Sequence, residues 1–309
     1  MIQNVPKLIV LCGPTGSGKT DLSLRLAKRF GGAIVSADSR QLYKEMTIGT
    51  AKPIGRWQWR GFRRVYIVEG IEHYNLDWLS PKKVFSAAEF KMRARKWIGR
   101  VLKQKQVPFV VGGTGLYIDA LVDNLSFPKV VANQKLRDEF SQKSLEELLT
   151  QLNEVDPEAG AMIDRNNPRR VIRALEVSLL SGTPFSAQRI KGEKLYDVLY
   201  LGVSVPKEEL DRRLDRRIDM MMEGCLVEEV RKLAKKYPFS LPSMSGIGYR
   251  EFEGFVKGEE TLEQAIVKLK TDTRQYAKRQ MTWFKRRNDI VWCKVYEEME
   301  ERVAEFLKR

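Results

Sequence analysis

The segment GPTGSGKT at residues 13–20 has the spacing G-x-x-x-x-G-K-[ST]. In such a loop, backbone N–H groups and the start of a helix surround a phosphate, and the lysine adds a positive charge. The hydroxyl group that follows the lysine reaches Mg²⁺, so Thr20 is the expected metal ligand. We predict that a diphosphate or a nucleotide is bound by Gly13, Pro14, Thr15, Gly16, Ser17, Gly18, Lys19 and Thr20.

Asp38 ends the apolar stretch AIVSAD, and we expect it to face the same crevice as this loop. The carboxylate could cap the following turn, hold magnesium, or accept a proton as a general base. An NTPase usually has an acid at the end of another buried strand, where it holds magnesium through water. The stretches VPFVVGGTG, LYLGVSV and DIVWCKV do not end in an acid. This absence counts against phosphoryl transfer.

Two groups of basic residues could bind an anion. Arg213 and Arg217 are four residues apart on one helical face, where both could point at the same anion. Alternatively, this face is solvated and pairs with Asp211 and Asp215. Further along, basic residues alternate with Tyr276, Trp283 and Phe284, a mixture that suits RNA phosphates and bases, or else a solvated helix with packed aromatic rings. These basic residues are Arg274, Lys278, Arg279, Lys285, Arg286 and Arg287.

The composition indicates a partner with negative charge. The chain has 309 residues and a formal net charge of +15, which favours nucleic acid or an acidic membrane, although a generally solvated basic protein is the alternative. Three distant cysteines and one histidine cannot form the usual zinc modules, which predicts a reduced, cytosolic setting. The apolar run 8–11 is too short for a signal or a membrane span. We therefore expect a cytoplasmic protein.

Strands and helices alternate around these residues. The pattern predicts strands at 7–12, 33–38, 107–113 and 197–205, and a helix after the phosphate loop that is closed by Gly31 and Gly32. Ser86 and Glu89 form a capping box before a long helix. The order predicts an α/β fold, a P-loop protein with a doubly wound parallel sheet whose ligands lie at the carboxyl ends of the strands.

Between about 129 and 195, strand signals are absent and the pattern predicts helices. One helix is expected to begin after Ser144, and another lies between Pro168 and Gly182. We interpret this segment as an inserted all-helical subdomain. The catalytic core is then expected at 1–128 plus 196–309. It ends in a long basic helix, the strand DIVWCKV and a closing helix.

Several segments, in this order, resemble the tRNA dimethylallyltransferase family over nearly the whole chain. They are GPTGSGKT, ADSRQLYKEMTIGTAKP (37–53), VGGTGLY (111–117), NNPRRVIRALEV (166–177), GIGYRE (246–251) and AKRQMTWFKRR (277–287). DSRQLYK together with IGTAKP is far more specific than the phosphate loop. No zinc-finger tail follows, so the form resembled is the compact bacterial type.

The resemblance implies transfer of a dimethylallyl group from dimethylallyl diphosphate to the exocyclic amine of the adenosine just 3′ of the anticodon. The phosphate loop would hold the diphosphate with Mg²⁺, which would explain the missing strand-end acid. Asp38 would bind the adenine amine and accept its proton, and Thr114 would hydrogen-bond near the reacting centre. From the residues alone, Thr114 is equally an N-cap. Arg213 and Arg217 match the family's paired arginines, which stabilise the departing diphosphate.

The family's contacts with RNA map onto residues of this chain. The expected partner is the anticodon stem-loop of a tRNA, bound by a monomer. The expected tRNA-binding residues are Asp38, Ser39, Arg40, Gln41, Arg137, Arg169, Arg170, Arg173, Gly248, Tyr249, Arg250, Lys278, Arg279, Gln280, Trp283 and Lys285.

The sequence departs from the family pattern in two places. RWQWRGFRRVYIVEG (56–70) lengthens the usual spacing and is predicted to be a surface hairpin. Cys225 stands where the family usually has glycine, which puts the turn geometry there in question.

Three other functions are weighed against the resemblance. A small-molecule kinase would use Asp38 as a base and turn over ATP, but the missing magnesium acid and the basic helix oppose it. Prenyl transfer to a free adenine nucleotide would not need the arginines of the helical insert. A nucleotide-gated RNA-binding protein without chemistry would tolerate the loss of Asp38 and Thr114.

Overall fold

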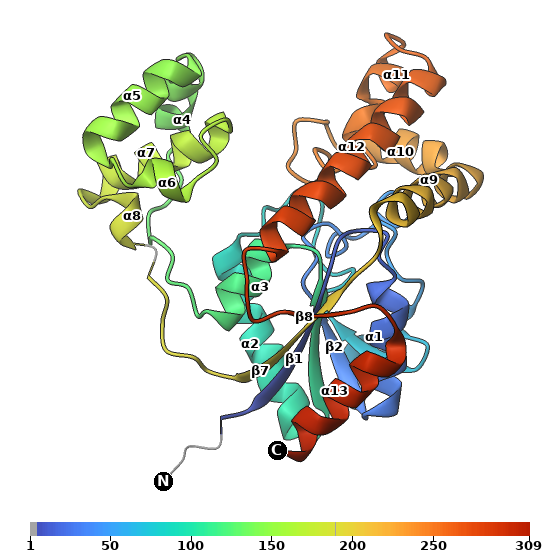
Figure 1. Ribbon diagram of the computed structural model, residues 1–309. Coiled ribbons are helices and arrows are strands. Elements are labelled where there is room, and N and C mark those ends of the chain that lie inside the picture. Colours follow the sequence, from blue (N-terminus) through green and yellow to red (C-terminus); the bar gives the residue numbers. More distant parts are fainter. Residues whose placement is uncertain (1–4, 189) are drawn as a thin grey trace. The chain divides into compact units, whose positions relative to one another are not determined.

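The computed structural model describes residues 5–188 and 190–309, and its centre is an eight-stranded sheet (Figure 1). The strand order is β3-β4-β5-β2-β6-β1-β7-β8, and every neighbouring pair from β5 to β8 is parallel. This confirms the predicted α/β class. The parallel strands are β1 (Lys7–Cys12), β2 (Gly32–Ser36), β5 (Ile71–Tyr74), β6 (Val107–Gly112), β7 (Asp197–Val203) and β8 (Val291–Cys293).

Helices cover both faces of the sheet, so the doubly wound arrangement is also confirmed. Successive side chains of a strand point to opposite faces. Leu8 and Val10 of β1 pack with one pair of helices, α2 (Ala87–Lys103) and α3 (Gly115–Val122). Ile9 and Leu11 pack with the other pair. That second pair is α1 (Lys19–Arg29) and α13 (Tyr296–Lys308).

Most of the local predictions hold, with small changes at the ends of elements. The capping box of α2 is present, with Glu89 N donating to Ser86 Oγ at 3.2 Å and Ser86 N donating to Glu89 Oε2 at 2.7 Å. Gly31 has φ 61° and follows α1, but Gly32 is already the first residue of β2 rather than part of the helix end. Cys225 has φ 70°, so it adopts the left-handed conformation that favours glycine.

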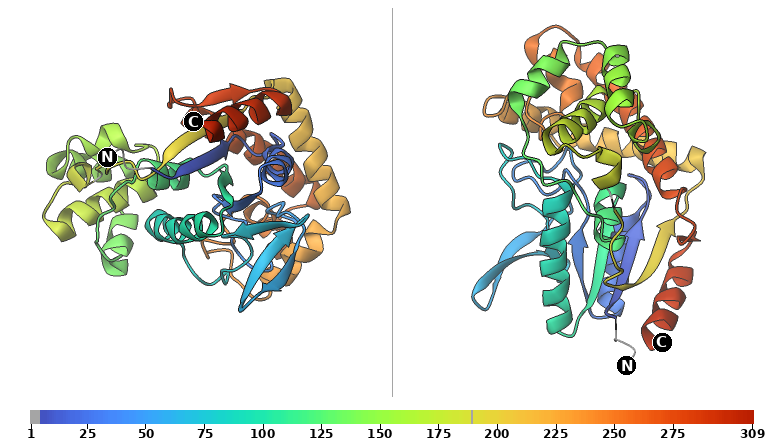
Figure 2. Two further views of the ribbon diagram at one scale, coloured as in Figure 1. Left: turned by 90° about the horizontal axis from the view of Figure 1, so that it is seen from below. Right: turned by 90° about the vertical axis from the view of Figure 1, so that its left-hand side faces the viewer.

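The predicted surface hairpin at 56–70 exists as β3 (Arg56–Arg60) and β4 (Arg63–Val68), which pair antiparallel. Figure 2 shows it in light blue, projecting from the sheet. It is only partly a surface feature, because β4 also pairs with β5 and its last four residues are buried. The apolar second half of the segment, VYIV, explains this burial, since it continues the sheet while the arginine-rich first half stays outside.

Helices from the C-terminal part of the chain gather beyond the carboxyl ends of the parallel strands (Figure 1). Their side chains join the core on the α2 face, for example Val230 and Leu269. These helices are α9 (Lys207–Glu223), α10 (Leu226–Ala234), η1 (Arg250–Phe252), α11 (Glu253–Lys257) and α12 (Leu262–Phe284).

Residues 123–194 form a second compact unit with its own apolar core. The expected insertion, 129–195, therefore begins six residues later than the unit in the structure, whose first residues form extended connections rather than helices. Phe140, Leu152 and Leu175 lie at its centre. Its helices are α4 (Gln134–Ser141), α5 (Leu145–Val155), α6 (Ala159–Met162), α7 (Pro168–Ser181) and α8 (Phe185–Gln188).

Over the described ranges 5–188 and 190–309, we find no helix with the length and apolar character that crossing a bilayer requires.

The single histidine makes stability depend on pH. His73 of β5 is buried, with Nδ1 3.0 Å from the carbonyl oxygen of Ile71, and burial lowers its pKa from 6.5 to about 4. Between these two values the unfolded chain binds a proton that the folded chain does not. We expect the free energy of unfolding contributed by His73 to be complete above pH 6.5. It should fall by about 1.4 kcal/mol per unit as pH decreases towards 4.

Denaturant unfolding at pH 7, 5.5 and 4.5 measures this effect, and His73→Gln is the control, because glutamine does not titrate. The slope of stability against pH should be smaller in the variant. Parallel profiles for the two proteins would contradict the assignment.

Candidate active site

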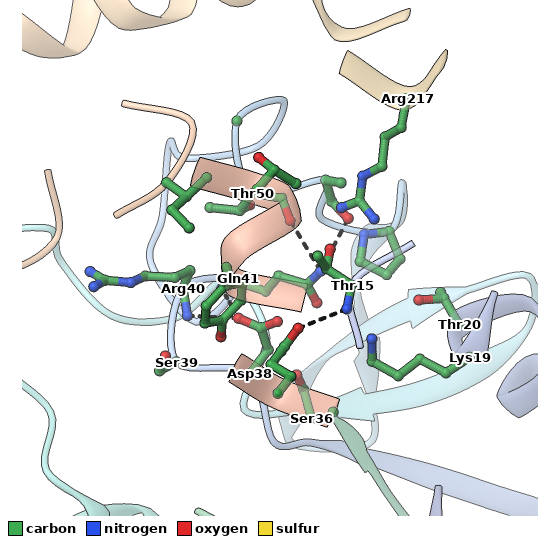
Figure 3. A pocket seen from close by; sticks show the side chains of 18 of the residues that line it. Thr15, Lys19, Thr20, Ser36, Asp38, Ser39, Arg40, Gln41, Thr50 and Arg217 are labelled. Carbon is green, nitrogen blue, oxygen red and sulfur yellow. Dashed lines mark hydrogen bonds between the residues drawn. The ribbon is translucent and has the colours of Figure 1, made fainter. Parts of the chain in front are cut away.

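A cavity of about 350 Å³ opens at the carboxyl edge of the sheet (Figure 3). Its walls come from the phosphate loop, the segments around 36–41 and 49–53, and helices α9 and α12. Among the described lining residues Asp38 is the only acid, whereas five side chains are cationic. The cavity is therefore suited to a ligand with several negative charges. The five cations are Lys19, Arg40, Arg217, Arg250 and Arg279.

The predicted phosphate loop joins β1 to α1. Gly16 and Gly18 have φ values of 78° and 83°, which let the chain turn sharply into the helix. A Cβ atom on Gly16 would lie 2.6 Å from Leu214 Cδ2, so glycine also lets α9 pack against the loop. The hydroxyl of Ser17 is buried and has no hydrogen-bond partner among the described residues. Thr15, Lys19 and Thr20 line the cavity.

Lys19 has an unusually low proton affinity. Its Nζ donates to the carbonyl oxygen of Pro14 at 2.9 Å. Its pKa is lowered to about 8, mainly by burial. Nearby Arg217 contributes to this decrease, and Asp38 opposes it. Burial also lowers the pKa of Arg217. Both cations have thus lost hydration, and an anion between them would restore favourable interactions.

Asp38 lies in the cavity just after β2, as predicted (Figure 3). Its Oδ1 accepts hydrogen bonds from the backbone N–H groups of Arg40 at 2.8 Å and Gln41 at 3.2 Å. The carboxylate therefore caps the following turn, which was one of the three alternatives. No described residue donates to Oδ2, so that oxygen is available to a ligand in the cavity.

Thr114 holds the loop that carries Asp38. Its Oγ1 accepts from Ser39 N at 3.0 Å and donates to Ser39 Oγ at 3.3 Å. Its backbone N donates to the carbonyl oxygen of Ala37, and its own carbonyl oxygen accepts from the first turn of α3. The residue thus begins a helix, as the N-cap alternative expected, but its hydroxyl binds the neighbouring loop instead of that helix.

Gln280 lines the cavity, and its predicted contact with tRNA stays a prediction. Its side chain is only 6% exposed, because it bridges two loops. Nε2 donates to the carbonyl oxygen of Gly113 at 2.8 Å, and Oε1 accepts from Thr15 N at 2.8 Å. Gln280 therefore ties α12 to the phosphate loop and to the loop after β6.

The two arginines of α9, Arg213 and Arg217, have different surroundings. Arg217 lines the cavity. Arg213 is exposed, and its Nε donates to Glu209 Oε1 at 2.8 Å. Its NH1 lies near the phosphate loop, 3.9 Å from where a Cβ atom of Gly18 would be, so its contact with a diphosphate stays a prediction. The alternative pairing with Asp211 and Asp215 is wrong, because these acids pair with Lys207 and Arg274.

The segment GIGYRE is mainly structural. Tyr249 is 1% exposed and donates its hydroxyl to Glu229 Oε1 at 2.8 Å. Gly248 lies so close to Gly49 that a Cβ atom would be 2.3 Å from the carbonyl oxygen of Gly49. The predicted tRNA contacts of Tyr249 and Gly248 are therefore wrong, because both are packed against the protein. Arg250 lines the cavity and pairs with Glu251 and Asp272.

Glu229 organises the site and was missed by the sequence analysis. Its Oε2 accepts from the backbone N–H groups of Thr47 at 3.0 Å and Ile48 at 2.9 Å, and Oε1 accepts from Gly49 N at 3.0 Å. This carboxylate holds the turn that precedes Thr50, a lining residue. No signal in the sequence distinguished it from the other glutamates of an amphipathic helix, because its backbone partners are 180 or more positions away.

The basic helix α12 is partly available to a ligand. Lys278, Arg279 and Lys285 are exposed, although Lys285 already lies just beyond the end of the helix. Trp283 is partly buried, and its predicted contact with tRNA stays a prediction. Its Nε1 donates to Asp119 Oδ2 at 2.8 Å, and its ring occupies the space beside Gly115. Gln41 lines the cavity and donates to the carbonyl oxygens of Thr50 and Ala51.

In the helical unit, two of the four predicted tRNA-binding arginines have an internal role. Arg137 and Arg173 both bind the fully buried carboxylate of Glu176, with Arg137 NH2 2.8 Å from Oε2. Burial raises the pKa of Glu176, but these arginines reverse the shift and lower it. A buried carboxylate needs these partners, and the contact of Arg137 and Arg173 with RNA stays a prediction. Arg169 and Arg170 are exposed, and their contact with RNA stays a prediction.

Comparisons with known proteins agree with this architecture. The family profile described as IPP transferase matches residues 41–287. The tRNA dimethylallyltransferase of Acetivibrio thermocellus is 40% identical over 310 residues, covering 97% of this chain and 96% of the relative. The tRNA dimethylallyltransferase of Bacillus cytotoxicus is 39% identical over 308 residues, covering 98% and 94%.

Solved structures give the same result. The tRNA isopentenylpyrophosphate transferase of Bacillus halodurans has a TM-score of 0.71 and 34% identity, with 98% of this chain and 97% of that chain covered. A eukaryotic dimethylallyltransferase acting on tRNA has a TM-score of 0.76 and 28% identity, with 94% and 74% covered. The resemblance seen in the sequence is confirmed, and this chain belongs to the IPP transferase family.

Proposed function

We propose that this enzyme transfers the dimethylallyl group of dimethylallyl diphosphate to the exocyclic amine of the adenosine 3′-adjacent to the anticodon of a tRNA. The observation that carries the proposal is the cavity, which combines a phosphate loop, several cations, one carboxylate and apolar side chains. The relatives named tRNA dimethylallyltransferase support the same reaction.

The two ends of the donor fit different parts of the cavity. Lys19 and Arg217 take the diphosphate, and the charge that grows on it during bond cleavage strengthens both contacts. Apolar side chains provide a dry place for the five-carbon group. These are Leu214, Ile218 and Met221 of α9 and Leu269 of α12.

Asp38 prepares the acceptor. The bond between the adenine nitrogen and the allylic carbon forms while the bond from that carbon to the diphosphate oxygen breaks. The nitrogen loses a proton, and Asp38 Oδ2 accepts it. Thr114 contributes by fixing the loop on which Asp38 stands, through its bonds to Ser39.

Magnesium fits this site through few protein ligands. Thr20 lines the cavity next to Lys19, and the described residues contain no cluster of three His, Cys, Asp or Glu side chains that could hold a metal. Mg²⁺ commonly binds substrate phosphates with only one or two protein ligands and keeps several waters. We propose that Thr20 and the diphosphate oxygens hold the ion, which neutralises part of the negative charge on the donor.

RNA binding requires contacts in addition to those inside the cavity. An adenosine must leave its stack to reach Asp38, which costs a few kcal/mol. Lys278, Arg279 and Lys285 in the core unit, and Arg169 and Arg170 in the helical unit, are exposed cations that offset this cost by binding phosphates.

One labelling experiment tests the proposed reaction. The protein is incubated with radiolabelled dimethylallyl diphosphate and, in separate tubes, unmodified tRNA, AMP or buffer. Label should enter tRNA alone, and nuclease digestion should release it on one adenosine. Label in AMP, or turnover of ATP without prenyl transfer, would overturn the proposal.

The role of Asp38 is tested by Asp38→Asn. Asparagine keeps the Oδ1 acceptor for the N–H groups of Arg40 and Gln41, so the turn is preserved, but it cannot accept the proton. We expect kcat to fall by at least about a hundredfold, the lower end for a general base, while the Kd for tRNA stays within about threefold. A near-normal kcat would remove Asp38 from the mechanism.

The low pKa of Lys19 predicts a pH dependence of donor binding. The lysine is protonated at pH 7 and loses its charge as pH rises through about 8, whereas a bound diphosphate favours the charged form. The Kd for inorganic pyrophosphate should therefore increase by up to roughly tenfold per pH unit above 8.

Calorimetric titration between pH 6.5 and 9.5 measures this dependence. In the control Lys19→Arg the guanidinium stays charged, so the curve should keep only the titration of pyrophosphate itself. Identical curves for both proteins would contradict the assignment to Lys19.

A further inference from the structure

The hairpin of β3 and β4 is a basic, aromatic surface with no role in the chemistry described above. Residues 56–68 contain four arginines, Arg56, Arg60, Arg63 and Arg64, and no aspartate or glutamate. Trp59 is 69% exposed, and Phe62 at the tip is fully exposed. Because exposed tryptophan and phenylalanine side chains often mark a binding surface, this hairpin is a candidate.

The strand register places Trp57, Trp59 and Arg64 on one face of the hairpin, and Arg56 and Arg60 on the other face. Trp59 is opposite Arg64, and Trp57 is opposite Tyr66. The guanidinium of Arg64 lies 5.6 Å from the centre of the Trp57 ring. Residues that are directly opposite on antiparallel strands place their side chains on the same side of the sheet. One face of the hairpin therefore presents an exposed indole beside a cation.

Charge selects the kind of partner. Arg56, Arg60 and Arg64 are exposed, and no described residue forms an ion pair with any of them. Arg63 is different, since it pairs with Glu72 at 3.6 Å. Exposed arginines along an edge strand oppose pairing with the edge of another sheet. Aromatic rings together with unpaired cations suit a polyanion with flat bases, which is RNA.

The base of the hairpin adjoins the cavity. Tyr66 donates its hydroxyl to the carbonyl oxygen of Pro53, a lining residue. Trp57 Nε1 donates to Asp77 Oδ2 at 3.1 Å, and Lys52 binds the other oxygen of Asp77 at 2.6 Å. An RNA that enters the cavity past Pro53 would come close to the hairpin.

We propose that the β3–β4 hairpin is a second RNA-binding element, which holds the tRNA substrate by stacking on Trp59 and Phe62 and by pairing of Arg56, Arg60 and Arg64 with phosphates. This inference rests on the proposed function, because it takes tRNA as the substrate. The hairpin adds affinity and does not touch the reacting atoms.

Two variants test the proposal in the full chain. One combines Trp59→Ala with Phe62→Ala, and the other combines Arg56→Ser, Arg60→Ser and Arg64→Ser; all five positions are exposed, so the core is unaffected. The control replaces three exposed lysines on other elements, Lys28, Lys103 and Lys308, by serine. It removes the same charge as the triple arginine variant.

We expect the Kd of each hairpin variant for unmodified tRNA to rise by about tenfold or more, because base stacking and phosphate pairing are lost. The slope of log K against log salt should become shallower by roughly two units in the arginine variant, at about 0.7 to 0.9 per lost phosphate contact. The kcat at saturating tRNA and the Kd for pyrophosphate should stay within about twofold of the unmodified chain, since the cavity is unchanged.

If both variants bind tRNA with the affinity and salt slope of the lysine control, the inference is wrong. Loss of binding to vesicles of anionic phospholipid, with tRNA affinity intact, would assign the hairpin to a membrane and also overturn it. If the unmodified chain itself neither binds nor prenylates tRNA, the proposed function fails instead. The outcomes therefore separate the two claims.

Discussion

The parallel pairing of β1, β2 and β6 is the constraint on which the site depends, because it brings three loops to one edge of the sheet. The close approach of these loops requires glycine. A Cβ atom on Gly112 would lie 2.2 Å from the carbonyl oxygen of Ala37, where the chain carries Asp38 into the cavity. Gln280 then closes the arrangement from α12, by bonding to two of the loops. The distance between the phosphate loop and the carboxylate is thereby fixed by backbone.

The charged side chains of the cavity determine which groups of the substrates bind where. Lys19 and Arg217 are partly stripped of water, and burial lowers the pKa of each. Preorganised cations of this kind interact with developing negative charge more strongly than hydrated ones would. Asp38 is the only acid among the described lining residues. The leaving group therefore faces cations, whereas the nucleophile faces a carboxylate in the same small cavity. In the proposed reaction, these charges favour heterolysis of the allylic diphosphate.

Local patterns in the sequence predicted the parallel core, the phosphate loop, the capping box of α2 and the position of Asp38. Long-range partners were beyond such patterns. Glu229 binds backbone N–H groups about 180 residues away, and Gln280 bonds to Thr15 across 265 positions. In the sequence these side chains resemble ordinary polar residues of a helix. The ion pair of Arg213 with Glu209 was not predicted for a related reason, since nothing in the spacing ranks Glu209 above Asp211 or Asp215 as its partner.

A crystal structure with tRNA and a non-cleavable thiolo analogue of dimethylallyl diphosphate tests the central claim most directly. The account predicts both phosphates in the loop of residues 13–20, between Lys19 and Arg217. It also predicts an adenine amine bonded to Asp38 and about 3 to 3.5 Å from the allylic carbon, as a near-attack geometry requires. A diphosphate bound outside this loop, or an adenine that does not reach Asp38, would contradict it.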